Sequence, residues 1–471
     1  MADARSPSRN RRFGEKQMGR KFVVFVGDCS QAGEVIANKP ITPLWVLVGF
    51  VDTLLRSYGQ VVFCNNPVTG LLIMIALFIS GPFAALVGLV AATIAIFTAW
   101  LLDQSPNAVR GGVFSYNAVL VGQLTAVLFP EMTIVDWIFM VFGAIFSVYF
   151  TSSFAALFGS ISKHPMPALT VPFVAAQVLV CLSAASPGAL YLKTPLPNLS
   201  GNIPGSALSN NSLLGGDSST NTSVQQALVA ATDLASTTND LPDSIVFNNG
   251  DGIVAMNASM NSIPNPTTVN IETLDWGEVF TGVLKSIGQA YGQEHLPGSL
   301  LMYLGVVISS PTTALMCLFG STVSTLVGAV LCPGPAESLY AGVWGYNGLL
   351  TAAALGGFAL VLTPQSAALA LMGALLTAVV HFALLASFLR AGVPLLTLPF
   401  NLAALLLLCA TARGGGSLVR PPALTYPEKH RRDWAAARHS KRSRNLSSPS
   451  DLSSPDDEVD KKEQFRKLEI I

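Results

Sequence analysis

Charged residues are scarce in this sequence and unevenly placed. They make up 11% of the 471 residues, whereas hydrophobic residues make up 51% and the mean hydropathy is +0.52. Soluble domains carry about 25% charged residues. Between residues 300 and 410 the only side chains expected to carry charge are Glu337, His381 and Arg390. So long a segment with so few charges is typical of a bundle of membrane helices and excludes a soluble globular domain.

The usual signatures of enzymes and metalloproteins are also absent. The six cysteines are scattered, with no Cys-x-x-Cys pair and no histidine at ligand spacing, so neither a metal site nor a disulfide framework is expected. No glycine-rich phosphate loop, nucleophile elbow or zinc motif occurs. The apolar runs hold no paired carboxylates, which proton pumps use. We therefore expect no enzymatic activity, no cofactor, no metal and no nucleic-acid partner.

The apolar stretches divide the chain into five regions. Residues 1–40 form a basic arm. No apolar run follows it as in a signal peptide, so we expect no cleavable signal peptide. The basic residues place this arm in the cytoplasm. Residues 41–192 and 276–415 each predict about five membrane spans, some of them broken. In the first half, the apolar run at 71–80 is expected to stop at Gly81-Pro82. In the second half, 300–317 and 319–332 are expected to be separate apolar runs. Residues 416–471 form a basic tail, which an even number of spans returns to the cytoplasm.

Residues 193–275 differ from both apolar halves because they are rich in Asn, Ser, Thr, Gly and Pro. An odd number of spans before this segment places it outside the cell. We therefore expect a flexible extracellular loop, with candidate glycosylation sites at Asn198, Asn210, Asn221 and Asn257. In the tail, Ser447 follows a basic stretch typical of kinase substrates, although a chance serine in a disordered tail explains it equally well.

Several short motifs occur twice, in the same order. The phrase Pro-x-x-Thr-x-Pro-Phe stands at 167–173 and again at 394–400. Proline breaks helical hydrogen bonding, and in hydrocarbon the freed carbonyls must face protein or a watery cavity. Two halves of five spans each would be inverted relative to one another, an arrangement that places a substrate path at their interface. The separations are nearly constant: Gln60 and Gln289 (289 − 60 = 229), Tyr116 and Tyr346 (346 − 116 = 230), and Thr170 and Thr397 (397 − 170 = 227).

The polar side chains in these motifs are neutral. Glutamine amides and threonine hydroxyls supply both donors and acceptors, and carbonyls beside the proline breaks supply acceptors. Such groups can replace the hydration of a small neutral amide, but they offer no counter-charge to an ion. Aromatic rings with leucines one helical turn further on could form a flat slot that suits a planar solute. The candidates for the slot are Phe63, Tyr116, Leu120, Tyr346 and Leu350.

Simpler structural roles remain open for the same residues. A Tyr-Asn pair in a membrane helix can be plain interhelical hydrogen bonding. Gln60 could cap a helix end, and Thr170 could bond back to a carbonyl of its own helix. His381 is expected to be a packed, hydrogen-bonded residue rather than a proton relay.

Taken together, these motifs resemble the urea transporter family of solute carriers. Residues 60–70 are similar to the family's first signature and residues 116–122 to its second, while the two Pro-x-x-Thr-x-Pro-Phe copies resemble the third. Residues 424–428 are similar to the family's C-terminal boundary. The resemblance covers roughly residues 40–190 and 276–428.

The resemblance implies an all-α integral membrane protein in which two inverted five-helix repeats, with re-entrant pore half-helices, surround a central pore. It implies a homotrimer in the plasma membrane, with both termini cytoplasmic, through which urea passes down its gradient. By motif match, Gln60 and Gln289 contact urea, and Thr170 and Thr397 bond to it at the narrow middle. The other expected pore residues are Val61, Phe63 and Ala290 at the slots, Tyr116, Leu120, Tyr346 and Leu350 on the flat faces, and Val171 and Leu398 beside the threonines.

One segment departs from the family pattern. In 289–297 the Asn-Pro that follows the first glutamine is missing, and the proline is displaced by one position relative to Pro67. The sequence therefore does not determine the geometry of that helix end, nor whether His295 gives the protein a pH response. The loop at 193–275 is also longer than the family pattern.

Three other functions fit parts of the sequence. The same scaffold could conduct another small neutral solute, such as ammonia, water, formamide or a urea analogue. An ion-coupled secondary transporter would need an intramembrane charged site, for which no residue is evident. A membrane adhesion protein would carry its function in the Asn-rich loop.

Overall fold

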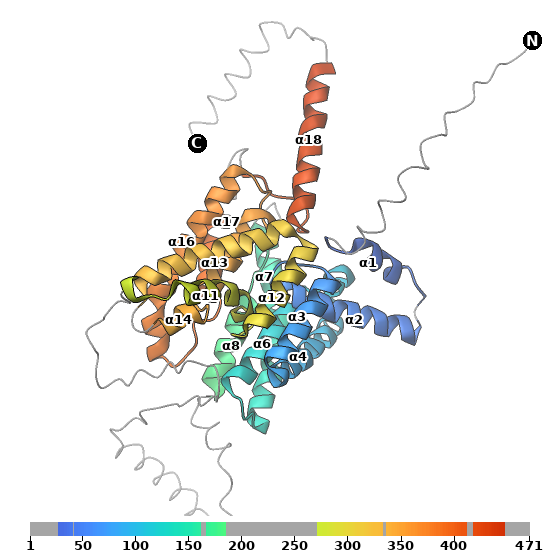
Figure 1. The fold of residues 1–471 in the computed structure, drawn as a ribbon. Helices are drawn as coiled ribbons and strands as arrows, with labels where there is room; N and C mark the ends of the chain where they lie inside the picture. Colours follow the sequence, from blue (N-terminus) through green and yellow to red (C-terminus); the bar gives the residue numbers. More distant parts are fainter. Residues whose placement is uncertain are drawn as a thin grey trace, which may run out of the picture.

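The structure is a computed structural model that describes residues 27–40, 42–161, 166–184, 271–332, 336–411 and 418–447. All regular secondary structure in these residues is helical, as Figure 1 shows. The predicted glycosylation sites lie outside the described residues, whereas Ser447 is the last residue of a described helix. The prediction of an all-helical chain is confirmed for the part that the structure describes.

The two halves of the chain have the same order of helices. From α3 onward, each helix of the second half begins 227 to 231 residues after its counterpart (296 − 67 = 229 for α12 and α3, 337 − 106 = 231 for α14 and α5, 398 − 171 = 227 for α17 and α8). The first half contains α2 (Pro43–Gln60), α3 (Pro67–Ser80), α4 (Pro82–Leu101), α5 (Pro106–Arg110), α6 (Tyr116–Leu128), α7 (Ile134–Ile161) and α8 (Val171–Ala184). The second contains α11 (Trp276–Gln289), α12 (Leu296–Ser309), α13 (Pro311–Leu331), α14 (Glu337–Tyr340), α15 (Tyr346–Ala353), a π-helical turn (Ala354–Phe358), α16 (Pro364–Arg390) and α17 (Leu398–Ala410).

Helix length and composition identify a membrane protein. Within the described ranges, α4, α7, α13 and α16 are long and apolar enough to cross a membrane. Five shorter apolar helices accompany them: α3, α6, α8, α12 and α17. The long helices occupy equivalent places in the two halves, α4 with α13 and α7 with α16.

Proline and hydroxyl side chains set several helix boundaries. The predicted stop at Gly81-Pro82 is confirmed, because α3 ends at Ser80 and Pro82 opens α4. The predicted division between 300–317 and 319–332 is wrong, since the break falls at Ser310. The Ser310 hydroxyl accepts the Thr313 N–H at 3.1 Å, and Pro311 takes the first helical position, where a missing N–H costs nothing.

The two halves share one core. Helix α3 packs against α12, and the Thr69 hydroxyl donates to the Gly305 carbonyl at 2.6 Å. The hydroxyl of Tyr291, two residues after α11, donates to the Tyr58 carbonyl in α2 at 2.7 Å. Both bonds are buried and join residues from opposite halves. The halves therefore cannot separate without leaving polar groups unpaired in an apolar interior.

Helices α3 and α12 begin in the same way despite their different sequences. Asn66 caps α3, where its side-chain oxygen accepts the Val68 N–H at 2.8 Å. His295 caps α12, where Nδ1 accepts the Gly298 N–H at 3.2 Å. The displaced proline stands at the second position of α12 instead of the first. The missing Asn-Pro therefore leaves the helix start intact, because histidine supplies the acceptor that asparagine supplies in the first half.

The N-terminal end of the described chain is tied to the membrane helices. The Gly27 carbonyl accepts from Asn66 Nδ2 at 2.9 Å and from Ser309 Oγ at 3.1 Å, and its N–H donates to the Ser309 carbonyl. The short helix α1 (Ser30–Ala37) follows. In α2, the Arg56 guanidinium donates to the Asp28 carbonyl at 2.8 Å and forms an ion pair with Asp52.

The C-terminal helix α18 (Pro427–Ser447) is held at the same end of the bundle and extends away from it (Figure 1). Glu428 accepts from the Ser310 hydroxyl and from the Thr312 N–H at the start of α13. Burial lowers the pKa of His430, which keeps the ring neutral near pH 7. Nε2 accepts the Thr425 N–H at 2.9 Å, so Nδ1 carries the proton and donates to the Gly357 carbonyl at 2.9 Å.

Replacing the His295 cap should destabilise the protein, and asparagine should restore it. His295→Ala removes the acceptor for the Gly298 N–H, a change that costs about 1 kcal/mol at a typical helix N-terminus. His295→Asn reproduces the cap that Asn66 provides in α3. Thermal unfolding of the purified protein in detergent should give a lower midpoint for alanine than for asparagine. Equal midpoints for the two variants would contradict a capping role.

Candidate functional site

The two Pro-x-x-Thr-x-Pro-Phe segments meet at the centre of the molecule. The Thr170 and Thr397 side-chain oxygens lie 2.7 Å apart, and both residues are buried. Each second proline stands near the start of a helix, α8 or α17, so the motif ends an irregular stretch and begins a helix. The expected interruption is therefore a gap between two helices rather than a break inside one.

Two tyrosines hold the irregular backbone in front of the threonines. Leu169 and Leu396 adopt left-handed conformations, with φ of 51° and 55°. Their carbonyls point to the tyrosine hydroxyls of the preceding motif, so that Tyr116 donates to Leu169 and Tyr346 donates to Leu396. Asn347 Nδ2 adds a second donor to the Leu396 carbonyl at 3.2 Å. Both tyrosines therefore anchor backbone, a role in addition to any contact with solute.

The paired glutamines are also fixed in the same way in both halves. Gln60 Nε2 donates to the Gly111 carbonyl at 2.9 Å, and Gln289 Nε2 donates to the Ala341 carbonyl at 3.0 Å. Both side chains are partly exposed. Since the amide nitrogen is engaged, the oxygen Oε1 is the atom left to accept a hydrogen bond from a solute. Gly111 and Ala341 are the C-cap residues of α5 and α14, so each glutamine caps the end of a short helix, as the simpler alternative for Gln60 expects.

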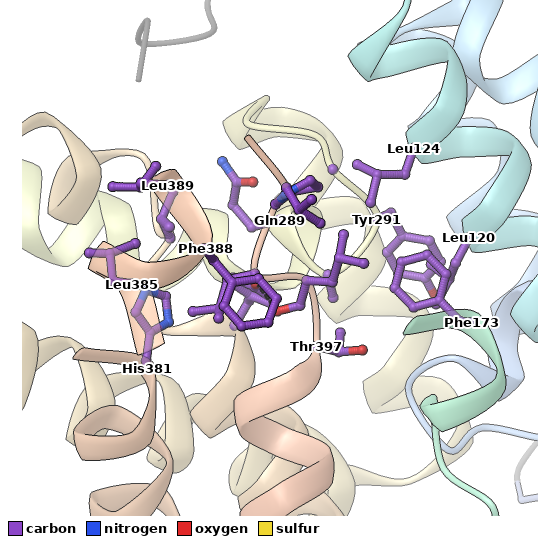
Figure 2. Close-up of a pocket in the computed structure, with 18 residues that line it drawn as sticks. Leu120, Leu124, Phe173, Gln289, Tyr291, His381, Leu385, Phe388, Leu389 and Thr397 are labelled. Carbon is purple, nitrogen blue, oxygen red and sulfur yellow. Dashed lines mark hydrogen bonds between the residues drawn. The ribbon is translucent and has the colours of Figure 1, made fainter. Parts of the chain in front are cut away.

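One cavity brings five of the predicted residues together. Figure 2 labels three of them, Leu120, Gln289 and Thr397. The volume of the cavity is about 180 Å³. The wall is mostly apolar and comes from α6, α8, α16 and the segments 290–292 and 393–397. The lining includes no Asp, Glu, Lys or Arg among the residues that the structure describes. The predicted residues in the lining are Leu120, Gln289, Ala290, Tyr346 and Thr397.

The remaining predicted residues do not line this cavity. Phe63 instead packs on two aromatic rings of the second half, with centroid distances of 4.7 Å to Phe358 and 6.2 Å to Phe400. Val61 and Leu350 are fully buried in the shared core. The other residues outside the cavity lining are Gln60, Tyr116, Thr170, Val171 and Leu398.

His381 is packed, as the sequence predicts, but the predicted hydrogen bond is missing at Nδ1, which is buried without a partner among the described residues. It is buried, and its ring stacks on Trp344 with centroids 4.8 Å apart and an interplanar angle of 25°. It also forms part of the cavity wall. Since a stacked ring has little freedom to reorient, packing explains this histidine better than proton relay.

Sequence reasoning missed Asn401, which lies at the central threonine pair. Its Oδ1 accepts from the Thr170 N–H at 3.1 Å and from the Thr170 hydroxyl at 3.2 Å. Its Nδ2 is buried and has no hydrogen-bond partner in the described part of the chain. A lone amide one turn after Thr397, in an otherwise apolar helix, was the available signal.

Phe358 was also missed, and no sequence signal marks it. It ends the π-helical turn after α15, where Gly356 and Gly357 leave helical geometry. That turn places its ring against Phe63. The contact depends on a local backbone distortion that hydrophobic periodicity does not reveal.

Comparison with known proteins identifies the family. The family model "Urea transporter" matches residues 51–216 and 252–412, which is more than half of the chain. The chain belongs to the urea transporter family. Its members among curated proteins include "Urea transporter 1" of Capra hircus, 28% identical over 420 residues that cover 89% of this chain and 91% of the relative. The protein of the same name in Rattus norvegicus is 29% identical over 428 residues, covering 90% and 91%. The predicted resemblance to urea transporters is confirmed.

Asn401→Val should slow urea permeation. Valine is the natural residue at the equivalent place in the first half, Val174 (401 − 174 = 227). The variant loses a donor that a urea carbonyl can use and frees the Thr170 N–H. A lost hydrogen bond of about 0.5–1.5 kcal/mol corresponds to roughly a two- to tenfold lower rate. Stopped-flow light scattering of proteoliposomes measures the rate.

The matched control for this prediction is Thr322→Val. Thr322 is an exposed residue of α13 whose hydroxyl bonds to the Leu318 carbonyl of its own helix. It should change the urea rate little. If Asn401→Val matches the control at equal protein content, Asn401 does not contribute to the pathway.

Proposed function

We propose that this protein conducts urea passively, down its gradient, through a narrow pore between its two halves. Membership of the urea transporter family supports urea as the solute. The observation that carries the mechanism is the central pair of threonine hydroxyls, 2.7 Å apart, with the free amide nitrogen of Asn401 beside them. One hydroxyl comes from each half, so the pair supports a path at the junction of the halves.

The chemistry of these groups matches urea. Urea presents N–H donors and one carbonyl acceptor, and stripping its hydration without replacement costs about 2–7 kcal/mol for each polar group. Gln289 Oε1 and the Thr397 hydroxyl can accept urea N–H groups, while Asn401 Nδ2 can donate to its carbonyl. Apolar walls such as Leu120 and Phe173 fit the flat faces of the molecule. The same groups offer no counter-charge to an ion.

We also propose that the halves are inverted repeats with re-entrant pore half-helices. Helices of 14 residues, such as α3 and α12, reach about 21 Å, which is short of the roughly 30 Å hydrocarbon thickness. The nearly constant offset between corresponding helices supports duplication. Under this proposal the chain has the five regions predicted from the sequence: the arm 1–40, the first repeat 41–192, the loop 193–275, the second repeat 276–415 and the tail 416–471.

The location of the termini follows from the same proposal. Gly27 and Glu428 are both bound at one end of the bundle, around Ser309 and Ser310, which supports placing both termini on the same side. The basic residues of the arm and tail favour the cytoplasm. The plasma membrane and the homotrimer rest on the family resemblance. Glycosylation in 193–275 and phosphorylation at Ser447 remain predictions.

Urea flux should not depend on an ion gradient. Liposomes that contain the purified protein should equilibrate urea at the same rate with and without an imposed proton or sodium gradient, because the pathway residues carry no coupling charge. Stopped-flow light scattering records the equilibration. Accumulation of urea above equilibrium under either gradient would refute the channel and favour a coupled transporter. Faster flux of ammonia or water than of urea would favour the second solute class.

Removing either central hydroxyl should slow urea sharply. Thr170→Val and Thr397→Val keep the side-chain shape but lose a hydroxyl at the centre of the proposed pathway, so we expect a decrease of at least about tenfold, equivalent to about 1.4 kcal/mol. Size-exclusion chromatography should show unchanged assembly. Normal flux in both variants would remove the threonines from the pathway.

A further inference from the structure

The position of Phe358 depends on a break in helical geometry. Phe358 ends the π-helical turn that follows α15, and Gly356 and Gly357 just before it have non-helical backbone angles. A carbonyl in such a turn lacks the partner that a continuing helix would supply, and a buried carbonyl needs a donor. The turn therefore requires partners from another part of the chain.

The C-terminal segment supplies these partners. His430 Nδ1 donates to the Gly357 carbonyl at 2.9 Å, and Nε2 of the same ring accepts the Thr425 N–H at 2.9 Å. Pro427 packs on the turn, since a Cβ atom on Gly357 would lie 2.7 Å from Pro427 Cγ. The histidine is buried and both ring nitrogens are used, so the ring is held in one orientation. We call residues 425–430 the C-terminal strap.

The strap is itself fixed to the start of α13. Glu428 accepts from the Ser310 hydroxyl at 2.8 Å and from the Thr312 N–H at 2.9 Å. The rest of α18 extends away from the bundle (Figure 1). The strap therefore holds its histidine in place from a helix that does not belong to the π-helical turn.

The turn places Phe358 at one slot of the proposed pathway. The ring centroids of Phe358 and Phe63 lie 4.7 Å apart, with an interplanar angle of 34°. The family resemblance assigns Phe63 to a slot, and Phe400 lies on its other contact at 6.2 Å. Phe63 and Phe400 are buried, whereas Phe358 is half-buried. Of the three rings Phe358 is thus the least enclosed, so its place depends most on its own backbone.

We infer that His430 is a positioning residue for urea permeation: through the Gly357 carbonyl it fixes Phe358 and so sets the width of the slot beside Phe63. The inference rests on the proposed urea pathway. His430 acts through the backbone and not by contact with the solute. The C-terminal segment thereby contributes to solute selection although it lies outside both halves of the membrane bundle.

Loss of the histidine has a defined effect on the slot. In His430→Ala the buried Gly357 carbonyl has no donor, which favours a rearrangement of the turn that returns the carbonyl to water or to helical pairing. Either rearrangement moves Phe358 away from Phe63, because Phe358 is the next residue in the chain. The slot then becomes wider and discriminates less by size.

The test compares two solutes of different size. Stopped-flow light scattering of proteoliposomes gives the rate for urea and for N-methylurea, which is larger by one methyl group. The ratio of the two rates does not depend on the amount of active protein. In His430→Ala we expect the ratio of the N-methylurea rate to the urea rate to rise at least about threefold. The matched control is His439→Ala, which removes an exposed histidine of the same helix and should leave the ratio unchanged.

An unchanged ratio in His430→Ala, while the wild-type protein conducts urea, would overturn the inference. Absence of urea permeation through the wild-type protein would instead refute the proposed function. If His430→Ala does not insert into the membrane, Glu428→Ala releases the strap from α13 and should raise the same ratio.

A double-mutant cycle tests the route through Phe358. Phe358→Ala alone should raise the ratio, because it removes the ring from the slot. Adding His430→Ala to Phe358→Ala should then change the ratio little, since the residue through which His430 acts is gone. If the effects of the two changes multiply, His430 acts by another route and the inference is wrong.

Discussion

The structure depends on satisfying two backbone carbonyls that leave helical geometry inside an apolar bundle. The Leu169 and Leu396 carbonyls precede the central threonines, where no helix supplies a partner, and an unpaired carbonyl there would cost several kcal/mol. Tyr116 and Tyr346 donate to them from the neighbouring helices. These bonds fix the irregular segments so that Thr170 and Thr397 meet. The polar groups at the junction of the two halves are thus held by uncharged partners, which is consistent with the neutral solute pathway that we propose.

Much of this arrangement could be predicted from the sequence, because the motifs that form it occur in both halves of the chain. Repetition of Gln60, Tyr116 and Thr170 at nearly constant spacing identified the glutamines, tyrosines and threonines as equivalent pairs before any contact was known. In the structure each pair has equivalent partners. Each glutamine donates to the carbonyl that precedes a left-handed glycine. Each tyrosine donates to the carbonyl that precedes a central threonine. Low charge and apolar helix lengths were sufficient for the fold class.

The rest could not be predicted, since apolar periodicity does not distinguish a pore wall from a packed interface. Leu350 lies one turn after Tyr346, yet neighbouring helices bury it completely. Phe358 reaches Phe63 through a π-helical turn, and Asn401 meets Thr170 across 231 residues of sequence. The His295 cap shows the reverse case, in which a changed residue type keeps the same geometry. Contacts of this kind depend on backbone detail and on long-range approach rather than on local pattern.

The bonds between the halves have a consequence for biosynthesis. The contacts Thr170–Thr397, Tyr58–Tyr291 and Thr69–Gly305 join residues 227, 233 and 236 positions apart. While the second half is still being translated, the first half is already in the bilayer, and its hydrogen-bonding groups at Tyr58, Thr69 and Thr170 lack their partners. Contacts so distant in sequence form late, because the intervening chain must be ordered first. The junction of the two halves is therefore completed late in folding, after α17 has been inserted. A nascent chain that stalls earlier leaves these polar groups unpaired, and quality-control factors can recognise them.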